Sequence, residues 1–170
     1  MARCEMAVEI DAPVETVWAL TQNAGRRPEW DYRILKVTLL NAESPDTGVK
    51  LRSEGKMGRR FHLDMEYVAF EPNRRSAVKM LKIAGMPFAG GGGSWRYEAI
   101  APGKSRFQTT IQMNPKPSAI MRWADKRLLE PMLKWMTKRS LNQLKLVAEA
   151  DARKASHSAF PPASALGREA

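Results

Sequence analysis

Strict alternation of apolar and polar residues, repeated in several short runs, is the feature that most constrains the fold of this chain. In the clearest run, FHLDMEYV at 61–68, every second residue is large and apolar. Successive side chains of a strand point to opposite faces, so this run predicts a strand with one buried and one solvated face. Other alternating or β-rich runs lie at 4–10, 34–40, 49–54, 77–83, 95–99 and 107–113. We therefore expect a sheet of about seven strands.

The segments between these runs have the composition of turns. They read SPDTG at 44–48, EPNRR at 71–75 and APGKS at 101–105. Strands that follow one another through short turns form an antiparallel sheet, which can keep one face in water. The stretch AGGGGSW at 89–95 lacks the lysine and the following helix of a phosphate-binding loop, so we interpret it as a flexible loop between two strands.

The apolar period changes to that of a helix after the last strand. Apolar residues recur at helical spacing from Leu128 to Ala148. Pro131 lies inside this pattern, so the helix either kinks there or begins there after a shorter helix from Ser118. We expect a long helix over 117–150 to cover the apolar face of a bent antiparallel sheet, which places the chain in the α+β class.

Two short helices are predicted between the first and second strands. Asp11 or Ala12 is expected to cap the first, with Pro13 in its first turn, and Asn23 is expected to end it. A second helical turn covers 28–30. Such short elements cannot bury a tryptophan alone, so Trp18 and Trp30 should fill the gap between the sheet and the long helix.

Residues 155–170, ASHSAFPPASALGREA, show no apolar period and predict a disordered tail. We assign residues 1–154 to one domain, because a chain of this length can bury a single core. The N-terminus lacks the apolar segment of a secretory signal, and Cys4 is the only cysteine. These features predict a cytoplasmic protein without an internal disulfide.

The net charge of +10 favours anionic partners. Nucleic acid is disfavoured, since no basic run of five residues and no nucleic-acid-binding motif occurs. Two interpretations stay open. The basic residues form a solubilising surface, or those of the long helix, including Lys134, Lys138 and Arg139, bind an anionic membrane.

The segment EIDAPVETVWALTQN at 9–23, followed by RPEWD at 27–31, resembles the opening of the START-like, or SRPBCC, superfamily, in particular its polyketide cyclase/dehydrase and lipid-transport branch. FEPNRRSAV at 70–78, GGGGSWRYEAIAPGKSRFQTTIQM at 90–113 and LNQLKLVAEA at 141–150 match in the same order. The resemblance spans Met6 to about Ala150 and implies a helix-grip fold around a deep hydrophobic cavity. It implies no single reaction, since members bind, carry or transform different ligands.

Within such a fold, the strand phase and the helical stripe predict which residues contact a ligand. They are Trp30, Leu51, Ser53, Phe61, Leu63, Met65, Tyr67, Trp95, Tyr97, Phe107, Thr109, Ile111, Met132 and Met136. The hydroxyl groups in this set either orient a ligand or bond to neighbouring backbone groups. His62, Asp64 and Glu66 should lie in solvent, because turning them inward would expel the apolar residues between them.

No catalytic residue, metal site or cofactor is predicted. The two histidines and one cysteine provide no zinc-ligand cluster, and no nucleophile motif is present. We expect the protein to bind or carry a hydrophobic small molecule, either a lipid or a polyketide-like compound. The alternative is a cyclase or dehydratase in which Tyr67, Tyr97 or a buried charge polarises a carbonyl group.

Overall fold

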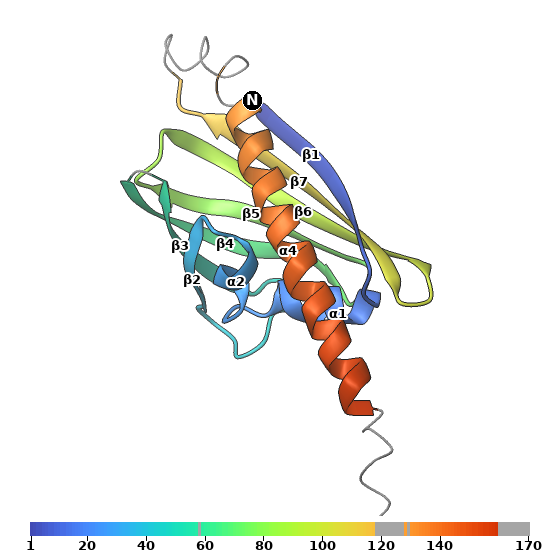
Figure 1. The fold of residues 1–170 in the computed structure, drawn as a ribbon. Helices are drawn as coiled ribbons and strands as arrows, with labels where there is room; N and C mark the ends of the chain where they lie inside the picture. Colours follow the sequence, from blue (N-terminus) through green and yellow to red (C-terminus); the bar gives the residue numbers. More distant parts are fainter. Residues whose placement is uncertain (58, 118–127, 129, 160–170) are drawn as a thin grey trace, which may run out of the picture.

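The computed structural model describes residues 1–57, 59–117, 128 and 130–159, and shows a curved sheet wrapped around one long helix (Figure 1). The sheet has seven antiparallel strands in the order β1-β7-β6-β5-β4-β3-β2. The strands are β1 (Ala2–Ile10), β2 (Ile34–Leu39), β3 (Lys50–Met57), β4 (Arg59–Glu71), β5 (Arg75–Ala84), β6 (Phe88–Ala101) and β7 (Lys104–Pro115). Helices α1 (Val14–Gln22) and α2 (Arg27–Trp30) follow β1, and α4 (Glu130–Ala159) ends the described chain. The predicted helix-grip α+β fold is confirmed.

The predicted strand phase is also confirmed. On β4, Phe61, Leu63, Met65 and Tyr67 are buried, and Phe61 lies opposite Gly55 of β3. The alternate residues of β4 lie on the other face and are partly exposed.

The polar face of β4 carries ion pairs with its neighbouring strands. The Asp64 carboxylate accepts hydrogen bonds from Arg52 Nε and Nη2 at 2.6 and 2.9 Å, and Glu66 Oε1 lies 3.4 Å from Lys79 Nζ. His62 is likewise half-buried on this side. These residues therefore belong to the solvated face, as the alternation predicted.

Helix α1 differs from its prediction by a residue or two at its start. Pro13 is the N-cap residue and forms no side-chain capping bond, so it precedes the first turn. The Asp11 backbone N–H donates instead to Glu149 Oε1 on α4, at 3.0 Å. The predicted end is confirmed, because Asn23 is the C-cap and its Oδ1 accepts from the N–H groups of Gly25 and Arg26.

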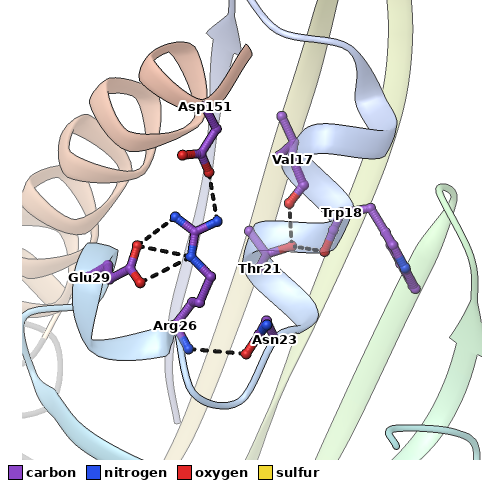
Figure 2. Close-up of polar contacts among 7 residues, drawn as sticks. All are labelled: Val17, Trp18, Thr21, Asn23, Arg26, Glu29 and Asp151. Atoms are coloured by element: carbon purple, nitrogen blue, oxygen red, sulfur yellow. Dashed lines mark hydrogen bonds and ion pairs between the residues drawn. The ribbon is translucent and has the colours of Figure 1, made fainter. Parts of the chain in front are cut away.

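Arg26 connects the short helices to α4 (Figure 2). Its guanidinium lies between Glu29 of α2, 2.6 Å away, and Asp151 of α4, 2.7 Å away. The hydrogen bonds from Arg26 lower the pKa of the Glu29 carboxyl. Because these side chains are partly exposed, the ion pairs help to fix geometry and contribute little stability, typically about 0–1 kcal/mol each.

The two tryptophans are packed against the sheet. Trp30 is buried in a cluster with Phe107 of β7 and with Leu141 and Leu144 of α4, which confirms its place between sheet and helix. Trp18 makes edge contacts with Phe70 and Tyr97, at ring-centre distances of 5.0 and 4.9 Å. Trp18 therefore anchors α1 to the sheet.

The loop predicted for the glycine-rich stretch is wrong. Gly90–Gly93 lie within β6, where Gly92 and Gly93 pair with Lys79 and Val78 of β5. A side chain at Gly91 would collide with the Gln112 carbonyl oxygen of β7. Gly91 and Gly92 thus allow neighbouring backbones to approach closely inside a bent sheet, which composition alone did not distinguish from a flexible loop.

Helix α4 begins at Glu130, so Pro131 stands at its start and does not kink it. The shorter helix predicted from Ser118 lies outside the described residues. At its other end α4 extends to Ala159, beyond the predicted start of a disordered tail at Ala155. Residues 160–170 of that predicted tail also lie outside the described residues.

The close contact at Gly91 leads to a prediction about stability. Gly91→Ala should lower the free energy of unfolding by about 2–3 kcal/mol, because the new Cβ meets backbone of β7 that cannot move independently. Gly90→Ala is the matched control, since its Cβ would find only ordinary contact with Asn114 at 3.9 Å. Urea denaturation measures both. Equal effects of the two substitutions would contradict the role assigned to Gly91.

Candidate functional site

A cavity of about 110 Å³ lies between the concave face of the sheet and the first turns of α4. Its walls are mostly apolar and include six methionines from both layers, Met65, Met80, Met86, Met113, Met132 and Met136. The predicted ligand-contacting residues that line it are Ser53, Phe61, Leu63, Met65, Trp95, Ile111, Met132 and Met136. The sheet and α4 therefore bring most of the predicted set to one place.

A second cavity, of about 30 Å³, lies towards α1 and β2. It is lined by Leu51 and Tyr67 from the predicted set. Ser53, Met65, Trp95 and Arg27 line both cavities, so these four residues form the boundary between them.

Trp30, Tyr97, Phe107 and Thr109 are buried but line neither cavity. Trp30, Tyr97 and Phe107 belong to the core cluster that includes Leu141, Leu144 and Ala148 from the middle of α4. Alternation correctly indicated the face of the sheet on which these residues lie. The alternation does not show where along that face a residue lies. That location decides whether the side chain lines a cavity or packs against the helix.

Tyr97 and Tyr67 belong to a buried hydrogen-bond network centred on Gln22. Gln22 Nε2 donates to the Tyr97 hydroxyl at 2.6 Å and to Ser76 Oγ at 2.9 Å, while Gln22 Oε1 accepts from the Tyr67 hydroxyl at 3.2 Å. The Tyr97 hydroxyl also lies 2.7 Å from Thr21 Oγ1. Side-chain partners thus satisfy both tyrosines.

Burial raises the pKa of both tyrosine hydroxyls, that of Tyr97 to about 12. For Tyr97, hydrogen bonds from Thr21 and Gln22 oppose this effect without cancelling it. Both groups are therefore neutral at physiological pH, and the arrangement suits a structural network better than proton transfer.

A charged cluster at one side of the larger cavity was not predicted. Arg27, Asp31 and Arg33 all line the cavity. Asp31 accepts two hydrogen bonds from Arg33, at 2.7 and 3.0 Å, one from Ser140 of α4 at 3.1 Å, and a longer one from Arg27 at 3.3 Å. The sequence signal was available, because two arginines flank Asp31 within four positions in a segment next to a buried tryptophan.

The charge state of Asp31 follows from a balance of opposing effects. Burial alone would raise the pKa of its carboxyl, but the charges of Arg33 and Arg27 outweigh burial and hold the pKa at about 2. The carboxylate is ionised at neutral pH. The cluster of one anion and two cations therefore carries a net charge of +1 beside an apolar cavity.

Arg27 is held in place by two aromatic rings. Its guanidinium carbon lies 4.1 Å from the centre of the Trp30 ring and 5.1 Å from that of Trp95. Cation–π contact of this kind stabilises a partly desolvated guanidinium and limits its movement. Trp30 thus shapes the site indirectly, although it does not line the cavity.

The apolar part of the lining was predicted incompletely. The further lining residues are Ile34, Val78, Met80, Met86, Phe88, Gly92, Gly93, Met113 and Leu133. Val78 and Met80 come from β5, which was predicted as a strand. Phe88, Gly92 and Gly93 come from the first half of β6, most of which was interpreted as a loop. If β6 had been recognised as a strand, the predicted cavity lining would have included its glycines and the residues of the strands beside it.

Within the described part of the chain, no group of three or more histidine, cysteine or acidic side chains is positioned to hold a metal ion. In the same residues, no helix combines the length and hydropathy needed to cross a bilayer.

Comparison with known proteins places the chain in a family. Residues 1–149 match the family of polyketide cyclase/dehydrase and lipid transport proteins, so the chain belongs to it. The resemblance to START-like proteins is thereby confirmed.

Among curated proteins, the uncharacterized membrane protein YndG of Bacillus subtilis is 27% identical over 151 residues. That alignment covers 84% of this chain but 55% of YndG, so the chain spans about half the length of this relative.

Solved structures with the same fold share little sequence with this chain. A Thermus thermophilus protein has a TM-score of 0.72 at 15% identity, covering 88% of this chain and 99% of its own. The Zhui aromatase/cyclase from Streptomyces has a TM-score of 0.68 at 15% identity, and the match covers 92% of this chain and 96% of its own. A START superfamily protein from Mycobacterium smegmatis has a TM-score of 0.65 at 16% identity, and the match covers 91% of this chain and 99% of its own. At these identities the likeness establishes the fold.

The charged cluster leads to a prediction about stability. Asp31→Asn should destabilise the fold by about 3–5 kcal/mol, since it leaves two largely buried arginines without their counter-charge. Asp64→Asn, which breaks a more exposed Arg52–Asp64 pair, should cost about 0–1 kcal/mol. Urea denaturation at neutral pH measures both.

The same carboxylate should make stability sensitive to acid. Because folding lowers its pKa from 3.8 to about 2, its contribution of about 2 kcal/mol is complete above about pH 4 and is lost as the pH falls through about 2. Asp31→Asn should lack this component. An unchanged acid dependence in the variant would contradict the assignment.

Proposed function

We propose that residues 1–154 bind or carry a hydrophobic small molecule, either a lipid or a polyketide-like compound, in the cavity between the sheet and α4. The observation that carries this proposal is the apolar cavity of about 110 Å³ between the sheet and the first turns of α4. Empty space forfeits contacts and destabilises a fold, so a cavity of this size is costly unless it is used.

The lining suits a ligand larger than the empty space. Met80, Met86, Met132 and Met136 surround the cavity, and methionine side chains adapt their shape at low cost. Met86, Phe88 and Met132 also line a surface groove next to the β5–β6 turn. We infer that a ligand enters there, with the methionines moving apart.

The comparisons support a ligand of this kind. The family description names lipid transport together with polyketide cyclase and dehydrase activity, and one neighbour in fold is an aromatase/cyclase. A cytoplasmic location stays a prediction, because the Bacillus subtilis relative carries the name of a membrane protein.

The second candidate function is a cyclase or dehydratase acting on a ligand in the same cavity. One observation favours it, namely the guanidinium groups of Arg27 and Arg33 in the cavity wall, which would stabilise negative charge on a carbonyl oxygen. Tyr67 and Tyr97 are weaker candidates, since hydrogen bonds within the protein occupy them. Chromatography with mass spectrometry of ligand recovered after incubation separates the functions: ligand unchanged in retention and mass contradicts the enzyme, and an isomer or loss of water supports it.

We further propose that the exposed face of α4 around Trp135 contacts an anionic membrane. Tyr32, Leu35, Leu128 and Trp135 are exposed, and the Trp135 ring lies edge-on to that of Tyr32, with ring centres 6.5 Å apart. Lys134, Lys138 and Arg139 are exposed on the same helix. Aromatic side chains beside cations match the interface between the acyl chains and the anionic headgroups.

Gly93 provides a direct test of the cavity. It lines the cavity, and a Cβ there would have only ordinary contacts, at 3.8 Å, with Thr110 and the Trp95 ring. Gly93→Leu should therefore fill the cavity without distorting the sheet, and reduce affinity for hydrophobic probes roughly 10-fold or more, since about 1–3 kcal/mol of apolar contact is displaced. Displacement of a fluorescent fatty acid measures the affinity.

Gly90→Leu is the matched control, because Gly90 lies on the same strand but does not line the cavity. It should leave probe affinity unchanged. If the wild-type protein bound no member of a broad lipophilic panel, or if both substitutions had equal effects, the cavity would lose its proposed role.

The membrane contact predicts that charge reversal abolishes vesicle binding. Lys134, Lys138 and Arg139, changed together to Glu, should prevent association with anionic vesicles, since each basic residue near the surface contributes about 1 kcal/mol. Binding by the wild type should weaken with salt, as the screening length falls from about 10 Å at 0.1 M to about 3 Å at 1 M. Vesicle co-sedimentation is the measurement.

The control for this experiment reverses Arg96, Arg153 and Lys154, which are exposed on other parts of the surface. It makes the same change in net charge and should retain binding. Equal binding of the wild type to neutral and anionic vesicles, or equal loss in both variants, would leave the basic residues as a solubilising surface.

A further inference from the structure

We propose that Arg27 binds an anionic head group of the ligand, so that the cavity selects hydrophobic carboxylic acids over their uncharged analogues. This inference rests on the proposed binding function and specifies its ligand class.

The lining of the cavities is electrostatically unbalanced. Among the described residues that line them, Arg27, Asp31 and Arg33 are the only ones charged at neutral pH, and together they carry +1. A buried charge without a counter-ion is unfavourable in an apolar site. A ligand carboxylate would bring the net charge of the site to zero.

Arg33 and Arg27 share Asp31 unequally. Arg33 forms two hydrogen bonds with the carboxylate, at 2.7 and 3.0 Å, whereas Arg27 forms one, at 3.3 Å. The Ser140 hydroxyl donates a further hydrogen bond to the Asp31 carboxylate. Among the described residues, Asp31 supplies the only acceptor to the Arg27 side chain. Arg27 therefore retains N–H donors for a ligand, and Arg33 serves mainly to neutralise Asp31.

The position of Arg27 suits an amphipathic ligand. It lies at the boundary of the two cavities, together with Ser53, whose hydroxyl is able to donate or accept a hydrogen bond. The larger cavity beyond them is lined by Leu63, Ile111 and Met136. A head group at Arg27 and Ser53 would thus place its chain along the apolar wall.

Arg27 is also oriented before the ligand arrives. Trp30 and Trp95 hold its guanidinium at 4.1 and 5.1 Å from their ring centres. A donor held in its binding orientation loses little conformational freedom when a ligand binds. Charge-assisted hydrogen bonds of this kind should change affinity roughly 10- to 100-fold.

The experiment compares decanoic acid with decanol, at neutral pH and below their aggregation limits, by displacement of an uncharged fluorescent probe. The wild type should bind the acid at least 10-fold more tightly than the alcohol. Arg27→Gln should remove this preference by weakening the binding of the acid more than the binding of decanol, and Arg27→Lys should restore part of it. Arg26→Gln, a neighbouring residue that lines neither cavity, should retain the preference.

The outcomes separate this inference from the proposed function. If decanol and decanoic acid bound the wild type equally, or if Arg27→Gln kept the preference, the inference would be overturned and the cavity would remain a hydrophobic site. If neither compound bound the wild type, the proposed function itself would fail. The wild-type comparison does not depend on the stability of any variant.

Discussion

The buried carboxylate of Asp31 is the interaction on which the assembly of the helical layer depends. It follows α2 directly, bonds through Arg33 to the start of β2, and accepts a hydrogen bond from Ser140 of α4. A charge in this position would be expelled without partners, so its burial requires that α2, β2 and α4 meet in one arrangement. Asp31 thereby fixes where α4 crosses the sheet.

The interface between α4 and the sheet divides into two parts with different packing. In the middle of α4, Leu141, Leu144 and Ala148 belong to a buried cluster with Trp30 and Phe107. The first turns of α4 contribute Met132, Leu133 and Met136 to the cavity wall. The aromatic part is closed by packing, and the methionine-rich part leaves space that can be reshaped. The charged cluster lies at the junction of the two.

The sequence predicted the fold because two periods were unmistakable. Alternation at Phe61–Tyr67 specified a half-buried strand, and the stripe of α4 specified its cover. The local sequence pattern does not specify where along the interface between the sheet and α4 a side chain lies. Tyr97 and Ser53 both face inward, yet Tyr97 lies in the core cluster with Phe107 and Leu144, whereas Ser53 lines both cavities. Gly91 was misread for a similar reason, since its need for close backbone approach arises only from pairing with β7.

The second arginine of the cluster is difficult to explain by folding alone. One guanidinium, that of Arg33, already forms two hydrogen bonds with Asp31 and suffices to neutralise it. Adding Arg27 places a second cation near the first in a site of low dielectric constant, where like charges repel strongly. The Trp30 and Trp95 rings offset part of this cost but do not remove the charge. Selection for stability would favour an apolar residue at position 27, so an anion that visits the cavity is the simplest reason for a cation there.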